Sequence, residues 1–519
     1  MAWLSFIILC PLVAALLIAV LPRNLRVLFR VLAVTATALS LAGALTVFFS
    51  FQTGSDGLQF EEYHPWIELL GAGYHLGVDG LNVGLVLLAT VVAFAAACLA
   101  WEVTHREKEF YLLLLLMTGG VIGAFAAFDM LLFFVFHELA LIPTFLMIGI
   151  WGRGPDRDYA AFKLTLYLMV GSLLVLLGLI GLHAAGGFRS LDMVDLQAHL
   201  AIDPAPVAWQ RTLFGLLLAG FGMLVALWPF HTWAPTGYAA APTPTAMLHA
   251  GVLKKFGLYG LIRVALPMLP EGARTWLPVL AVLCLGNILY SGLVAIRQRD
   301  LNLLIGNSSV AHVGFAFLGI ASLNVLGVTG AVLVMVAHGF LAALLFGLNG
   351  WLHQRFGSTE MDRFGGLLVA LPFAGTLLAM AMLAGCGLPG FAGFPGEALV
   401  LFGAWQYSRV LTVLAAWGAL ILAAVYMLRA IRTVLHGPLP EKLRGIAADV
   451  QNPWQRLPYA LLLAGLVYFG VWPRALVDKV QPAAAEVVAR ARSWAAVPGS
   501  SMPSGTLLAG NDPEPGGTP

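Results

Sequence analysis

Apolar residues in this chain form long, almost unbroken runs, not the narrow apolar stripes of a soluble helix. A helix needs roughly 20 predominantly apolar residues to cross the hydrocarbon core of a bilayer. The runs therefore predict an all-α polytopic membrane protein with about fourteen transmembrane helices. The predicted spans are 3–21, 27–51, 79–100, 110–127, 129–151, 160–185, 211–234, 242–268, 275–296, 302–322, 325–352, 367–407, 410–435 and 455–475.

Two of these runs are interrupted by proline and glycine. "LWPFHTWAPTGYAAAPTPT" covers residues 227–245, and "CGLPGFAGFPGE" covers residues 386–397. Paired interruptions at corresponding positions are typical of transporters with inverted repeats, whose unwound backbone lines a polar site near the midplane. We predict two inverted five-helix repeats with broken helices 7 and 12. The alternative is that proline and glycine are simply frequent in membrane helices.

This interpretation divides the chain into five parts. They are three N-terminal helices in 1–109, a first repeat of helices 4–8 in 110–268, a second repeat of helices 9–13 in 269–436, helix 14 in 437–475, and a polar tail in 476–519 that is expected to be disordered beyond about 495.

Positive charge is distributed unevenly between the two sides of the predicted bundle. Lysine and arginine concentrate in the connections that follow odd-numbered spans, for example around 23–30, 153–163 and 429–456. The long connection 52–78 has several acids and neither lysine nor arginine. Cytoplasmic loops carry the excess of lysine and arginine. The chain is therefore predicted to span a bacterial inner membrane with both termini on the periplasmic side.

Composition agrees with this class and excludes others. The chain is 60% hydrophobic and 10% charged, against roughly 45–50% and about 25% in soluble domains. A net charge of +2 does not point to nucleic acid. The four cysteines form no CxxC pair, so the sequence indicates neither a disulfide framework nor a metal cluster. We find no phosphate-binding glycine loop and no haem or iron–sulfur ligand spacing.

Several ionisable residues fall inside the apolar runs. A charge at the centre of a membrane helix costs roughly 2.5–3.5 kcal/mol on insertion scales, so such residues are usually paired or functional. The acids and lysines are Glu138, Lys254, Lys255 and Glu397, and the histidines are His137, His231, His249, His312 and His338. Proton transfer is one interpretation. The other is structural: a protonated, hydrogen-bonded glutamate and satisfied core histidines.

Local patterns refine this set. "HELAL" is not the zinc motif HExxH, because Leu141 stands where the second histidine is needed. Adjacent residues on a helix point about 100° apart, so Lys254 and Lys255 are expected to face different surroundings, one of them snorkelling or lining a second cavity. Glu397 is expected at the positive end of a half-helix, where a carboxylate is favoured.

Taken together, these motifs resemble a known family. "FFVFHELALIPTFLMIGIWG", "PFHTWAPTGYAAAPTPTAMLHAGVLKKFGLYGLIR", "SSVAHVGF", "VAHGF" and "GLPGFAGFPGEALVLFGAW" resemble the antiporter-like membrane subunits of respiratory complex I, best of all the subunit M branch. The resemblance covers roughly residues 70–436. It implies fourteen helices with two inverted repeats, and a proton-translocating subunit without a cofactor that works beside other membrane subunits of an NADH-quinone oxidoreductase.

The resemblance also implies residue roles. Glu138 matches the glutamate of the fifth helix that partners a lysine, and Lys255 matches the central lysine of the eighth helix. His312 and His338 match a polar relay, and Glu397 matches the terminal acid on helix twelve. The remaining relay candidates are His137, His231, His249 and Lys254.

This chain departs from the family pattern in the first half. Leu224 stands where the family usually has the lysine that partners Glu138, whereas His249 and Lys254 are polar where subunit M is usually apolar. Asn302 and Leu303 replace a usual basic pair. We therefore expect Lys254 to reach Glu138, or His249 or His137 to serve it, or else an altered or silent first half-channel.

Three functions follow from these observations. The first is a proton-pumping subunit of a complex I-type oxidoreductase. The second is the same module in a membrane hydrogenase, a multisubunit cation/proton antiporter or an inorganic-carbon uptake complex. The third is a structural spacer subunit that does not conduct.

Overall fold

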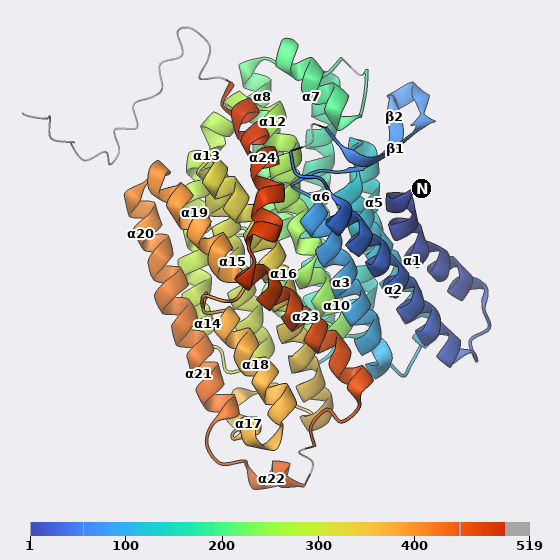
Figure 1. Ribbon diagram of the computed structural model, residues 1–519, viewed down its shortest axis with the longest axis vertical. Helices are drawn as coiled ribbons and strands as arrows, with labels where there is room; N and C mark the ends of the chain where they lie inside the picture. Colours follow the sequence, from blue (N-terminus) through green and yellow to red (C-terminus); the bar gives the residue numbers. More distant parts are fainter. Residues whose placement is uncertain (1, 55–56, 188, 446–447, 494–519) are drawn as a thin grey trace, which may run out of the picture.

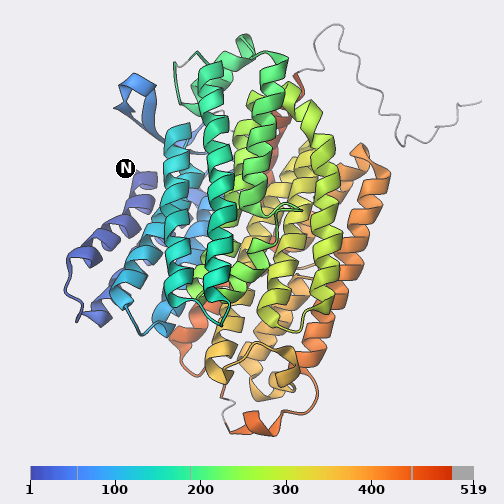
Figure 2. The same cartoon turned by 180° about the vertical axis from the view of Figure 1, so that it is seen from behind.

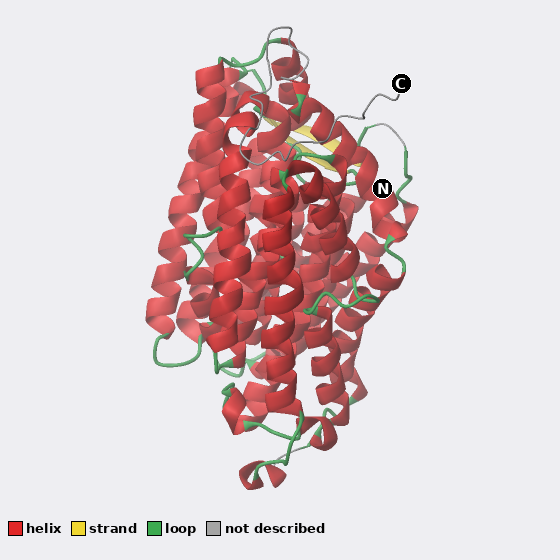
Figure 3. Ribbon diagram, turned by 90° about the vertical axis from the view of Figure 1, so that its left-hand side faces the viewer, coloured by secondary structure: helices red, strands yellow, loops and turns green. Residues whose placement is uncertain are grey.

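The structure is a computed structural model that describes residues 2–493 apart from 55–56, 188 and 446–447. Most helices run nearly parallel along one axis, and a small β-hairpin lies near one end of the bundle (Figure 1, Figure 3). Within the described residues, eleven helices are long and apolar enough to cross a membrane, or twelve if one bent pair counts as a single span. The predicted all-α membrane class is confirmed.

The N-terminal half contains the hairpin and ten helices. They are α1 (Trp3–Val20), α2 (Arg26–Ser50), β1 (Gln59–Ile67), β2 (Ala72–Val78), α3 (Val83–Leu99), α4 (Glu107–Ala126), α5 (Met130–Trp151), α6 (Arg157–Ala185), α7 (Met193–Ile202), α8 (Val207–Val225), α9 (Trp233–Ala240) and α10 (Thr243–Gly251).

The C-terminal half continues the bundle with shorter helices at its interruptions. They are α11 (Phe256–Gly260), α12 (Leu266–Met268), α13 (Pro270–Leu285), α14 (Ser291–Arg297), α15 (Leu301–Ala321), α16 (Val325–Phe356), α17 (Leu367–Ala370), α18 (Pro372–Ala384), α19 (Gly393–Tyr407), α20 (Arg409–Trp417), α21 (Ala423–Leu435), α22 (Glu441–Arg444), α23 (Pro453–Val471) and α24 (Arg474–Ala491).

Burial ranks the helices from the centre of the bundle outward. The apolar windows of α15 and α16 are 94% and 100% buried, whereas those of α1 and α6 are 39% buried. Helix α16 packs against α10, α15, α19, α23 and α24. The bundle is therefore built around α15 and α16, with α5, α6 and α8 on the face seen in Figure 2.

The first predicted break separates α8 from α9. Ala226 adopts a left-handed conformation at φ 68°, and the chain resumes a helix at Trp233. Asn287, fully buried in a π-helical turn between α13 and α14, holds this break. It accepts from Trp228 N at 2.7 Å and donates to the carbonyls of Ala226 at 2.9 Å and Val310 at 3.3 Å. A buried side chain thus satisfies backbone groups that the interruption frees.

The second predicted break separates α18 from α19. Gly387 and Gly390 have φ values of 70° and 98°, which side chains with a Cβ rarely adopt. A Cβ at Gly387 would also lie 2.7 Å from a carboxylate oxygen of Glu397. Glycine there lets the backbone approach the acid closely.

A third interruption was not predicted. Between α10 and α11, Leu253–Lys255 form a single 3₁₀ turn, and a π-helical turn follows at Leu261–Ala265. The predicted span 242–268 is therefore a series of short helical pieces. The predicted span 367–407 is divided between α18 and α19 at its expected break, and the predicted span 455–475 corresponds to α23, which meets α24 at 69°. The count of fourteen and the inverted repeats stay predictions.

Two segments outside the predicted spans are folded. Residues 59–78, expected as a connection, contain the antiparallel pair β1–β2. Residues 474–491, which no predicted helix covered beyond 475, form α24. The helix is stabilised by packing of its apolar face, including Leu476, Val480 and Ala484, against α12 and α16. Residues 494–519 lie outside the described chain.

Candidate functional site

The lysine pair begins the site. The 3₁₀ turn carries Lys254 and Lys255 into the bundle, where they are 1% and 0% exposed. Lys255 Nζ donates to the carbonyl of Ala250 and to Nδ1 of His338, the latter at 2.8 Å. Lys255 is thereby joined to α16.

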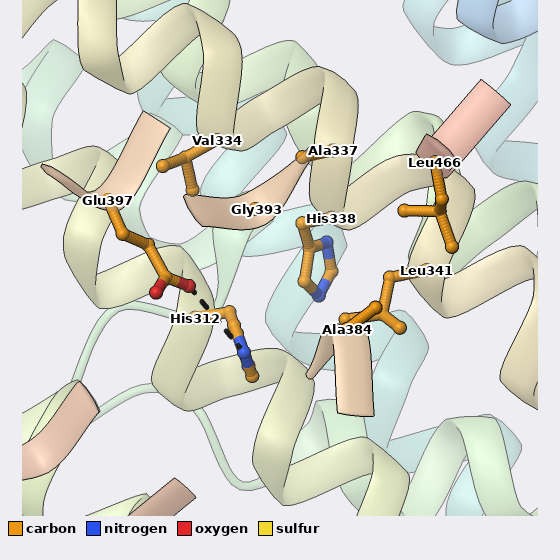
Figure 4. Close-up of a pocket in the computed structure, with 9 residues that line it drawn as sticks. All are labelled: His312, Val334, Ala337, His338, Leu341, Ala384, Gly393, Glu397 and Leu466. Carbon is orange, nitrogen blue, oxygen red and sulfur yellow. Dashed lines mark ion pairs between the residues drawn. The ribbon is translucent and has the colours of Figure 1, made fainter. Parts of the chain in front are cut away.

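Two histidines and an acid extend this contact across the bundle. The rings of His338 and His312 have centroids 6.0 Å apart, and His312 Nε2 lies 3.8 Å from Glu397 Oε1 (Figure 4). The three residues come from α16, α15 and α19, and all line one small cavity. Its volume of about 10 Å³ is close to what one water molecule needs.

Backbone and hydroxyl groups fix the ring of His312. Its Nδ1 lies 2.8 Å from the carbonyl of Ser308, and its Nε2 lies 3.1 Å from the carbonyl of Gly385 in the second break. The Ser308 hydroxyl lies 3.2 Å from His312 Nδ1 and 3.2 Å from the Tyr426 hydroxyl. The interrupted helix thus supplies a free carbonyl to a buried imidazole.

The side chain of Lys254 also points toward α15, the helix that carries His312. Its Nζ donates to Ser309 Oγ at 3.2 Å on α15 and lies 5.8 Å from the ring centre of Tyr238. The expectation that one lysine snorkels was wrong, because the broken helix places both ammonium groups among buried polar partners. The two lysines do take different partners.

Glu138 occupies a different setting. Its side chain on α5 is 30% exposed and lines a mostly apolar pocket of about 400 Å³ between α5 and α6. The Ser172 hydroxyl donates to its carboxylate, and His137 Nδ1 lies 3.4 Å away. Leu224 lies nearby, because a Cβ at Gly171 would be 3.3 Å from it. The leucine thus packs against α6 one residue before Ser172.

Lys254 makes no direct contact with Glu138. Among the described residues, no hydrogen bond or ion pair joins them, and the 3₁₀ turn directs Lys254 to Ser309 and Tyr238. A link between them through intervening polar groups stays a prediction. His137 is the residue that contacts Glu138, and its ring stacks on Phe256 with centroids 3.9 Å apart.

The remaining histidines lie between these two regions. His249 stacks on Trp233 at 5.5 Å and meets Tyr238 edge-on at 5.5 Å, and Lys254 Nζ lies 5.8 Å from the centre of the same Tyr238 ring. His231 lies in the first break against Tyr290. Within the described chain, Nδ1 of both His231 and His249 lacks a hydrogen-bond partner.

Glu397 is the fifth residue of α19, one turn from the position expected. The interaction with a helix dipole is concentrated in the first turn. The contacts of Glu397 are therefore set by His312 and the close approach of Gly387, and less by the helix end.

Sequence reasoning missed the hydroxyl and amide groups that hold the site. Ser172, Ser308, Ser309, Tyr426 and Asn287 all make buried or partly buried contacts with candidate residues or their backbone. Asn302, noted for replacing a basic residue, accepts from Asn349 at 2.5 Å. Adjacent polar residues in "GNSSV" were the available signal.

Within the described chain, no group of three or more His, Cys, Asp or Glu side chains is arranged to hold a metal ion.

Comparisons with known proteins agree on one family. Residues 127–423 match the family described as NADH:quinone oxidoreductase/Mrp antiporter, transmembrane. NAD(P)H-quinone oxidoreductase chain 4 1 of Synechococcus sp. (strain JA-2-3B'a(2-13)) is 37% identical over 95% of this chain and 93% of its own. NADH-quinone oxidoreductase subunit M of Rhodobacter capsulatus is 36% identical over 93% of this chain and 96% of its own.

A solved structure shows the same fold. A chain of respiratory complex I from Thermus thermophilus with bound NADH is similar with a TM-score of 0.85 and 29% identity. The similarity covers 95% of this chain and 100% of that chain.

Proposed function

Because the chain belongs to the NADH:quinone oxidoreductase/Mrp antiporter transmembrane family, we propose that it carries protons across a bacterial inner membrane as a subunit of a complex I-type NADH-quinone oxidoreductase. Its partners are the other membrane subunits of that assembly, in which the redox reaction takes place. Both of its termini face the periplasm.

One observation carries this proposal: the buried series Lys255, His338, His312 and Glu397. The first link is a hydrogen bond of 2.8 Å, the second joins two rings at 6.0 Å, and the third spans 3.8 Å. Each side chain exchanges protons, and ionisable groups inside a membrane bundle mark proton relays. The small cavity shared by the last three residues has room for one water to bridge them.

In this series, Lys255 holds the proton at the start of the path, and Glu397 is the last side chain that accepts it. A proton leaving the Lys255 ammonium passes to His338 Nδ1, which accepts its hydrogen bond. It then crosses to His312 and reaches the Glu397 carboxylate. A histidine suits an intermediate position, since one ring nitrogen accepts while the other donates.

Glu138 serves the other half of the path. We assign His137 as the proton-exchanging partner of Glu138, because its Nδ1 lies 3.4 Å from the carboxylate, whereas the side chain of Leu224 has no polar group. His249, stacked on Trp233 beside Tyr238, then joins this region to the second half, while His231 at the first break and Lys254 beside Ser309 flank the path without being required links.

The alternative assemblies differ in partners and not in the path. The family description includes Mrp antiporters, so the module could serve a cation/proton antiporter, a hydrogenase or a carbon-uptake complex. Neighbouring genes distinguish these: quinone-oxidoreductase subunits beside this gene support the proposal, and their replacement by one soluble partner contradicts it.

Replacement of Glu397 by glutamine separates a proton-translocating subunit from a spacer. In the assembled complex reconstituted in vesicles, Glu397→Gln is expected to lower proton passage through this chain roughly 10²-fold or more, the usual effect of losing a positioned proton-transfer group. Glu360→Gln is the matched control, because Glu360 is 55% exposed and pairs with Arg363 at the surface. Unchanged pumping with unchanged assembly would support the spacer and overturn the proposal.

A further inference from the structure

A second cavity shares no lining residue with the cavity of His312, His338 and Glu397, and it lies beside Arg30 and Arg153. It measures about 550 Å³, and its lining residues come from α2, α3, α10, α16 and α23 and from the segments next to α3 and α23. Val34, Phe94, Cys98 and Leu99 are among its apolar walls. We propose that this pocket binds a membrane phospholipid, with one acyl chain inside and the headgroup at its rim.

The rim has the chemistry of the headgroup level of a bilayer. Three indoles line it, from Trp101, Trp351 and Trp454, of which the first and last are 53% and 79% exposed. Tryptophan is enriched where apolar chains meet the polar headgroups. The pocket therefore opens at the depth where a lipid changes from glycerol to hydrocarbon.

Positive charge lies beside the same rim. Arg30 stacks over the Trp101 ring at 5.2 Å. Arg26 and Arg30 share one acid, Glu107, at 3.7 and 2.9 Å, which leaves one positive charge in excess in that cluster. A phosphate is the lipid group that such a rim attracts.

Glu102 lines the pocket, but its carboxylate does not repel an anionic lipid, because its charge is already paired. Glu102 accepts from Arg153 at 2.9 Å, from Thr243 N and Oγ1 at 2.9 Å each, and from Gln354 at 2.5 Å. Its charge is thus neutralised within the protein. Neutral amides of Asn452 and Gln455 line the pocket as well and suit the ester groups of a glycerolipid.

The size of the pocket favours a chain over a protein helix. A helix about 10 Å across occupies roughly 420 Å³ for each 5.4 Å turn, so the pocket would hold little more than one turn. Divided by the roughly 30 Å³ of a water-sized group, its 550 Å³ holds about 18 such groups, near the number in one acyl chain.

Photo-crosslinking tests the proposal in the assembled complex. The probe is phosphatidylglycerol with a diazirine on one acyl chain, mixed into vesicles with the complex and mapped by mass spectrometry after illumination. We expect adducts in residues 94–102 and 347–354, and their loss in Val34→Trp, which fills the pocket. Leu39→Trp on the same helix is the matched control, because Leu39 is 46% exposed and does not line the pocket.

Three results would overturn the proposal. They are adducts confined to the outer faces of α2 and α23, equal adducts in Val34→Trp and Leu39→Trp, or no adducts in residues 94–102 and 347–354, the result expected if another subunit fills the pocket. If Val34→Trp fails to assemble, Cys98→Phe fills the pocket from α3 and takes its place.

Discussion

Asn287 is the side chain that joins the first helix break to the rest of the bundle. Its amide makes three buried hydrogen bonds, to Trp228 N, the Ala226 carbonyl and the Val310 carbonyl. Asn287→Leu keeps the branched arrangement of side-chain heavy atoms, while three backbone groups lose their partner. The loss of one hydrogen bond costs a net of about 1 kcal/mol in soluble proteins and about 0.6 kcal/mol on average in membrane proteins. A buried backbone group that is left without any partner adds a further cost. We expect a total destabilisation of about 2–5 kcal/mol.

The assay is the rate at which this subunit is lost from the purified complex at one elevated temperature. Since about 1.4 kcal/mol corresponds to a tenfold change, the half-life is expected to shorten at least about tenfold. Val282→Leu, at a 62% exposed position in α13, is the control. A half-life for Asn287→Leu equal to that of the control would refute the reasoning that this amide holds the break.

Two further predictions concern histidines. Burial lowers the pKa of His75, but hydrogen bonds and charges from Asp192 and Glu61 more than offset this and raise it above its ordinary value of 6.5. The contact of His75 with these acids therefore stabilises the hairpin fully below about pH 6.5 and is lost as pH rises through the higher folded pKa. Hydrogen-exchange protection of residues 59–78, corrected for intrinsic rates, should fall with rising pH in the unmodified protein and stay constant in His75→Asn. An equal fall in His75→Asn contradicts this. His137→Phe keeps a ring for stacking and removes the base beside Glu138, so proton passage should drop roughly 10²-fold with assembly intact; unimpaired pumping would show that His137 does not serve Glu138.

The positions of the helices could be predicted because the bilayer constrains them strongly. An apolar run of about 20 residues has few alternatives to a spanning helix. The runs at 3–21, 129–151 and 302–322 coincide with α1, α5 and α15 to within about two residues, as expected of helix ends. Clusters of proline and glycine likewise revealed two of the three interruptions.

The arrangement of the site could be predicted only in part. His312, His338 and Glu397 were expected in a relay, and the structure brings them to one cavity. The directions of the Lys254 and Lys255 side chains were not predicted, because "GVLKKFG" contains no proline that would indicate an interruption of the helix. Helical geometry alone then gave the wrong surroundings for Lys254.

The surroundings of Glu138 depend on tertiary packing. Its partner Ser172 is 34 residues away on α6, and a lone serine in an apolar run gives no local sign of its partner. The helix α24 was missed for a different reason. Its polar residues resemble a solvated tail, although Leu476, Val480 and Ala484 follow one another at the helical spacing of four.

The adjacent lysines offer the most direct test of the path from Lys255 to Glu397. The measurement is the number of protons translocated per electron pair by the reconstituted complex carrying Lys255→Met or Lys254→Met. Both lysines are buried in the same turn, but only Lys255 donates to His338. We expect Lys255→Met to abolish the contribution of this chain to the number of protons translocated per electron pair, whereas Lys254→Met retains most of that contribution. Equal ratios for Lys255→Met and the unmodified complex would contradict it.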